Sequence, residues 1–165
     1  MLAKEAPREQ QLVAGYTLLV DLLRDEARVD GILLLKDLPE PTERLVRRIA
    51  DQSSTAVERL VARLDQPPRI QLVNDGLPLI EVEARARIRG WTTTRLLAGR
   101  GVSLECSLIV SQLQAVDGIR ALADALREEE PDQERTQVLD GISATFGSIR
   151  TELQSRLEQI AGSSP

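Results

Sequence analysis

The sequence predicts an all-α protein with a four-helix-bundle core and one additional helix. Apolar residues recur at spacings of three and four, proline and glycine clusters interrupt the pattern, and aromatic residues make up only 2% of the chain. The core must therefore consist mainly of Leu, Val, Ile and Ala, which suit helix-on-helix packing. The 165 residues fit a single domain over 1–165. We expect an ordered core from about residue 8 to 160 and a frayed tail over 161–165.

The first half of the chain predicts two amphipathic helices. The first covers about residues 8–37, with Gly31 as a point where it can bend, and Pro39 and Pro41 end it. The second covers about residues 42–64, with Thr42 as its N-cap, and Pro67 stops it. Their apolar stripes contain Leu12, Tyr16, Leu19 and Leu23, and then Leu45, Ile49, Ala56, Leu60 and Leu64.

One longer linker, about residues 66–77, separates these helices from the rest. Within it, Ile70, Leu72 and Val73 predict a short extended piece laid on the bundle, and Asn74–Gly76 predicts a turn. Pro78 suits the start of the next helix.

Three further helices are expected after the linker. The first runs to about residue 98, with Ile80, Ala84, Ile88 and Trp91 as its apolar face. Gly99-Arg100-Gly101 then makes residues 78–129 either two helices or one kinked helix, and we favour a break, with Ser103 capping the fourth helix. The last helix opens at Pro131 or Asp132 and runs to about residue 160. Short loops predict antiparallel neighbours.

The chain has no histidine and one cysteine, Cys106. Without histidine there is no Ser-His-Asp triad, no Cys-His nucleophile and no HExxH or Glu-x-x-His metal motif. The glycines at 99 and 101 lack the GxxxxGK[ST] pattern of a phosphate-binding loop. We therefore expect no enzyme activity, no cofactor and no metal.

Net charge and hydropathy limit the partners and the cellular compartment that we expect for the protein. A net charge of −5 and a pI near 4.9 make nucleic acid an unlikely main partner. A lone cysteine fits a reducing cytoplasm. No apolar run approaches the roughly 20 residues that a membrane helix needs, and the first residues hold no signal-like stretch. The expected protein is cytoplasmic, with no membrane partner.

Two features are candidate sites. The first is a cluster in which Trp91 lies among arginines, whose guanidinium groups suit binding of an anion or a protein partner. The alternative is a solvated helix face on which the arginines pair with Glu81 and Glu83, while Trp91 fills the core. The second is Gln112, a polar residue on an apolar stripe, which predicts an interhelical hydrogen bond that fixes register. The arginine cluster comprises Arg85, Arg87, Arg89, Arg95 and Arg100.

The leading functional hypothesis is a non-enzymatic interaction module, an adaptor, regulatory or assembly subunit acting through helix–helix contacts. The protein partner is unknown. Apolar residues on more than one helix face, such as Leu18 and Leu22, predict a homo-oligomer. One alternative is a degenerate ferritin-like metal binder that uses carboxylates such as Glu26 and Glu105. Another is a helix-turn-helix transcriptional regulator that uses residues 49–64.

Overall fold

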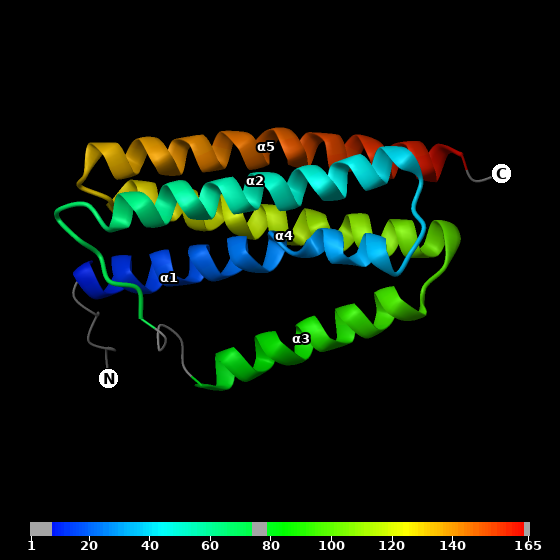
Figure 1. Cartoon of the computed structure of the whole chain (residues 1–165), viewed down its shortest axis with the longest axis horizontal. Coiled ribbons are helices and arrows are strands. Elements are labelled where there is room, and N and C mark those ends of the chain that lie inside the picture. The colour runs from blue at the N-terminus through cyan, green and yellow to red at the C-terminus, as the bar shows by residue number, and fades with distance from the viewer. Residues whose placement is uncertain (1–7, 74–78, 164–165) are drawn as a thin grey trace, which may run out of the picture.

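The computed structural model describes residues 8–73 and 79–163, which form helices and loops without any strand. The long helices are α1 (Arg8–Glu26), α2 (Glu40–Leu64), α3 (Leu79–Ala98), α4 (Gly101–Glu129) and α5 (Gln133–Gly162) (Figure 1). A short 3-10 helix, η1 (Val29–Leu34), lies between α1 and α2. The prediction of an all-α bundle with one extra helix is confirmed.

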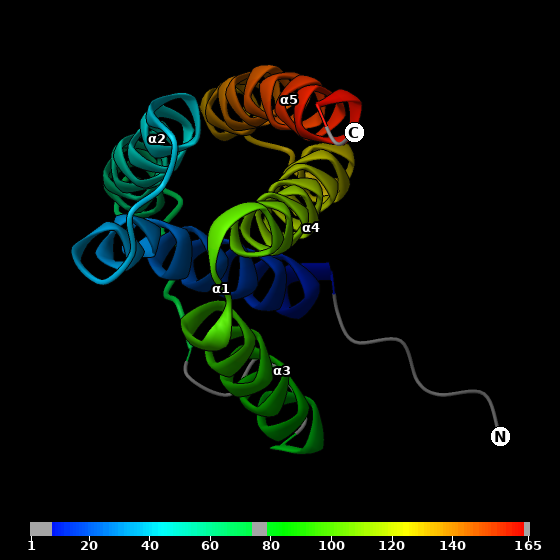
Figure 2. The same cartoon turned by 90° about the vertical axis from the view of Figure 1, so that its right-hand side faces the viewer.

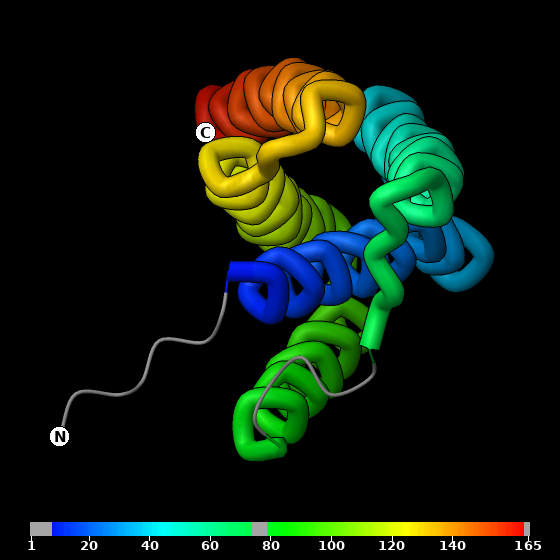
Figure 3. The backbone as a smooth tube through the Cα atoms, turned by 90° about the vertical axis from the view of Figure 1, so that its left-hand side faces the viewer, coloured from blue at the N-terminus to red at the C-terminus, as the bar shows by residue number. Residues whose placement is uncertain are grey.

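Four of the helices form a closed ring in the order α1, α2, α5, α4 (Figures 2 and 3). In Figure 1, α1 and α5 run in one direction while α2 and α4 run in the other, so ring neighbours are antiparallel as predicted. Because α2 and α4 run the same way, the chain must return along the bundle between them. Helix α3 makes this return, outside the ring, which gives the bundle a single long crossover connection.

The core inside the ring is mainly aliphatic, with Tyr16 and Phe146 also fully buried in it. Each ring helix sends one stripe inward, represented by Leu19, Ile49, Ile119 and Ile149, all fully buried. Gly15 of α1 faces α4, where a Cβ atom would lie 2.7 Å from Leu126 Cδ2 and would displace that side chain. Among the described residues, no helix combines the length and the apolar character that a bilayer-spanning segment needs.

A buried polar network joins the elements at the end where α4 passes to α5. Tyr16 Oη donates to Glu130 Oε2 at 2.5 Å, and Arg135 Nη2 donates to Glu130 Oε1 at 2.9 Å. Arg135 Nη1 also donates to the Pro68 carbonyl oxygen at 2.7 Å, which ties down the loop after α2. Burial alone would raise the pKa of Glu130, but the hydrogen bonds from Arg135 and Tyr16 outweigh it and lower that pKa.

The structure corrects the predicted start and end of several helices. The single helix expected over 8–37 is wrong: after Glu26 the backbone tightens, with Gly31 N–H bonded to the Arg28 carbonyl at 3.1 Å, and turns toward α2. Leu34 and Leu35 are left exposed. At the other end, α5 continues through residues expected to fray, to Gly162, and residues 164–165 lie outside the described residues.

Both predicted N-caps are also wrong. Helix α2 begins at Glu40 after Pro39, and Thr42 instead hydrogen-bonds to the buried Glu105 carboxylate. Helix α4 begins at Gly101 rather than after Ser103. The last helix begins at Gln133, next to the predicted start, and Asp132 caps it because its side chain accepts from Arg135 N–H at 2.8 Å.

The break between the third and fourth helices is confirmed. Gly101 has φ +55°, in the left-handed region that glycine adopts without strain. The chain reverses its direction there and enters α4. In the linker, Ile70 and Leu72 pack against the core without forming a strand, and Val73 N–H donates to Thr17 Oγ1 at 3.2 Å. The predicted turn at Asn74–Gly76 and the start at Pro78 lie outside the described residues.

The buried network predicts a large effect of removing one charge. Glu130→Ala leaves the guanidinium of Arg135, 3% exposed, without its buried carboxylate. We expect the free energy of unfolding to fall by about 3–5 kcal/mol in urea denaturation at pH 7.

The matched control is the neighbouring Glu129→Ala. Glu129 forms an exposed ion pair with Arg8, whose loss should cost about 0–1 kcal/mol. Equal losses for the two variants would contradict a structural role for the buried network.

Candidate interaction surface

Helix α3 is built like the other helices but is not covered like them. Its 20 residues include no buried side chain, whereas α4 buries nine and α5 seven. Figure 2 shows α3 standing away from the ring, below α1 and α4. Most of the stability of a protein helix comes from packing of its apolar face against another element.

The apolar residues of α3 that repeat at helical spacing are exposed together. We call Ile80, Ala84, Ile88 and Trp91 the α3 stripe. Ile80 is 82% exposed, Trp91 69% and Ile88 57%. Such a stripe normally faces a protein interior. The expectation that Trp91 fills the core, the alternative to a binding role, is therefore wrong.

Polar contacts attach α3 to the bundle. Arg89 Nη1 donates to Asp25 Oδ2 of α1 at 2.7 Å. Lys36 Nζ, in the loop after η1, donates to the carbonyl oxygens of Leu97 at 2.6 Å and Gly99 at 3.1 Å. These contacts hold one side of α3 toward the bundle and leave the stripe uncovered.

The predicted arginine cluster does not converge on one point. Arg85 pairs with Glu81 one turn earlier at 2.9 Å, and Arg89 pairs with Asp25. By contrast, Arg87, Arg95 and Arg100 form no ion pair with any described residue. The cluster is thus partly the solvated face that the alternative interpretation expected, and partly a set of unpaired cations beside the stripe.

A groove of about 230 Å³ lies between α3 and α4. Arg95 of α3 forms one wall and α4 forms the other, which includes the half-exposed thiol of Cys106 and the exposed Val110. Val102, at the start of α4, is also exposed. Arg95 lies one helical turn after Trp91, so this groove, which both polar and apolar side chains line, begins where the α3 stripe ends. Its lining residues are Arg95, Cys106, Ser107, Val110, Ser111 and Gln114.

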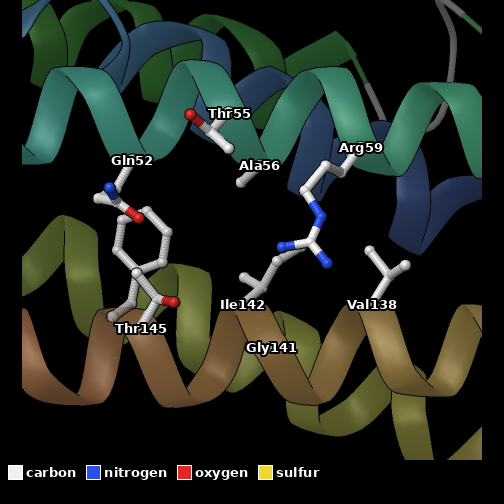
Figure 4. Close-up of a pocket in the computed structure, with 9 residues that line it drawn as sticks. Gln52, Thr55, Ala56, Arg59, Val138, Gly141, Ile142 and Thr145 are labelled. Carbon is white, nitrogen blue, oxygen red and sulfur yellow. The ribbon is translucent and has the colours of Figure 1, made fainter.

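A pocket between α2 and α5 is too small for an organic ligand (Figure 4). Its volume is about 30 Å³, against the roughly 300–1,000 Å³ of typical ligand sites. The Arg59 side chain reaches from α2 toward Ile142 of α5, and Gln52 and Thr145 face each other at the opposite end. This space fits water rather than a substrate.

A larger groove between α2 and α5, of about 470 Å³, contains three arginines. Each has a carboxylate partner: Arg44 pairs with Glu40 at 2.9 Å, Arg48 with Glu152, and Arg156 with Glu105 at 2.8 Å. Because these charges are already paired, the groove offers little attraction to an added anion.

Gln112 lies where the sequence placed it, buried between helices, with 5% of its surface exposed. It hydrogen-bonds to the carboxylate of Glu26 on α1. Glu26 Oε2 and Gln112 Oε1 are both buried without a hydrogen-bond partner. Burial raises the pKa of Glu26 from 4.5 to about 7, against the opposing effect of the Gln112 hydrogen bond and with a further increase from Asp25.

The carboxylates that suggested a metal site lie in separate networks. Glu105 hydrogen-bonds with Thr42 and Arg156, whereas Glu26 hydrogen-bonds with Gln112. Across residues 8–73 and 79–163, no group of three histidine, cysteine or acidic side chains is placed to hold a metal ion. Ferritin-like bundles also have one crossover connection, but the described residues do not fit the metal centre of such bundles.

The helix-turn-helix interpretation of residues 49–64 is wrong. These residues lie inside one uninterrupted helix, Glu40–Leu64, with Ile49, Ala56 and Leu60 facing the core. A helix-turn-helix motif needs two helices at a large angle, joined by a short turn.

Comparison with known proteins adds no further guide. No known family matches the chain, and no curated protein or solved structure is detectably similar to it.

The Glu26–Gln112 pair predicts a pH-dependent stability. A carboxyl whose pKa is raised by folding stabilises the protein fully below pH 4.5, and this stabilisation is lost as the pH rises to about 7. Glu26→Gln removes the ionisation, and its amide can donate to Gln112 Oε1. We expect the variant to be more stable than the wild type by about 2–3 kcal/mol at pH 8 and to differ little near pH 4.

Urea denaturation across this pH range provides the measurement. Glu9→Gln, an exposed change on the same helix, is the control for the loss of one negative charge. If the difference in unfolding free energy between the wild type and Glu26→Gln is the same at pH 4 and pH 8, the raised pKa of Glu26 is contradicted.

Proposed function

We propose that this protein is a non-enzymatic interaction module that binds a protein partner through the α3 stripe. The observation that carries the proposal is a regular apolar stripe, ending in a tryptophan, on a helix with no buried residue. Contiguous exposed apolar surface is a mark of interaction sites. An adaptor, regulatory or assembly role in the cytoplasm fits this surface and the single cysteine.

The composition of the surface supports a protein partner over a small ligand. Tryptophan and arginine are the residues most enriched among those that dominate binding energy at protein interfaces. Trp91 supplies a large exposed apolar body, and Arg87 and Arg95 supply donors without ion-pair partners among the described residues. The shallow groove beside them suits a helix or extended segment better than an enclosed molecule.

The test is co-purification from the native cell with a tagged chain, followed by measurement of binding with purified components. The chain with Ile88→Glu and Trp91→Glu should lose the identified partner, with affinity reduced at least tenfold, because two apolar contacts are replaced by charges.

The matched control is Leu34→Glu with Leu35→Glu. These leucines are also strongly exposed but lie outside α3, on η1 and directly after it. The control should retain the partner. Equal recovery with all three proteins would show that the α3 stripe is not the binding surface.

A further inference from the structure

The α3 stripe is arranged so that it can pair with itself. Its members lie at positions 80, 84, 88 and 91, nearly symmetric about residue 86. In an antiparallel pair of α3 helices from two copies, Ala84 of one copy lies opposite Ile88 of the other. In the same register, Ile80 lies opposite Trp91. A large side chain then faces a large one at both ends, and a small one faces Ile88 at the centre, as interlocking helices require.

The charges beside the stripe fit the same arrangement. Glu83 and Arg87 lie on the same side of the stripe, one helical turn apart, and neither forms an ion pair with a described residue. A two-fold axis perpendicular to antiparallel helices brings the same side of each together. Glu83 of one copy therefore lies near Arg87 of the other, and this pairing occurs twice in the dimer. The two Arg87 side chains are neighbours at the axis, and each also has Glu83 of its own helix one turn away. Arg85, which would otherwise face a like charge, is already paired with Glu81.

We propose that the protein forms a homodimer in which the α3 stripe of one copy packs against the α3 stripe of a second copy, with the two helices antiparallel. This inference rests on the proposed function and names its partner. The contact is isologous and closes at two copies, so it does not build filaments. Because each copy contributes the same stripe, the dimer covers both exposed tryptophans at once.

Light scattering coupled to size-exclusion chromatography, over a wide range of concentration, tests the dimer. The wild type should change from monomer to dimer, and Trp91→Glu should weaken dimerisation at least about tenfold without changing the helical signal in circular dichroism. A wild type that stays monomeric throughout overturns the dimer. That result would not contradict the proposed function, in which the α3 stripe would then bind a different protein.

Charge reversal tests the pairing. Glu83→Arg alone and Arg87→Glu alone each place like charges opposite one another and should weaken dimerisation. An equimolar mixture of the two should dimerise, because the reversed charges then complement each other. Two single variants that dimerise as well as the wild type would overturn the proposed contact.

Disulfide trapping tests the orientation. In a Cys106→Ser background, chains with Ala84→Cys and with Ile88→Cys are mixed and oxidised. An antiparallel pair should cross-link the two different chains much faster than either chain with itself, because identical positions lie four residues out of register, about 6 Å along the axis. Preferential cross-linking of identical chains would indicate a parallel pair and overturn the proposal.

Discussion

The arrangement of the whole molecule depends on one constraint of connectivity. Helices α2 and α4 run in the same direction in the ring, so the chain must travel the length of the bundle between them (Figure 1). The ring closes with four inward-facing apolar stripes, and α3 adds no buried residue to them. The returning segment therefore lies outside. It returns as a helix, α3, whose apolar stripe is left without a partner inside the chain.

The buried polar groups have a different role from that of the exposed α3 stripe. Tyr16, Glu130 and Arg135 satisfy one another at one end of the ring, and Thr42, Glu105 and Arg156 do so between α2, α4 and α5. Each network spans elements far apart in the sequence, and mismatched packing would leave a charge buried without its partner. Such networks fix which helices meet, whereas the aliphatic stripes supply most of the stabilisation.

Periodicity predicted the helices, and the glycine and proline positions predicted the break at residues 99–101 and the start of the last helix near Asp132, because these follow from local stereochemistry. It could not tell which stripes would be covered. The stripe of α3 and that of α4 look alike in the sequence, yet Leu108 is fully buried and Ile80 is exposed. What decides between them is the closure of the ring, a property of tertiary packing. For the same reason, the sequence identified Gln112 and Glu26 separately but not their contact.

The most direct test of this account compares unfolding free energies under conditions where the wild type is monomeric. Ile88→Ala and Trp91→Ala should each stay within about 0.5 kcal/mol of the wild type, since neither side chain is buried in the monomer. Leu108→Ala and Ile119→Ala, which empty the ring, should each cost about 2–5 kcal/mol. A loss of that size from the α3 changes would contradict the account, because it would show that α3 packs into the core of its own chain.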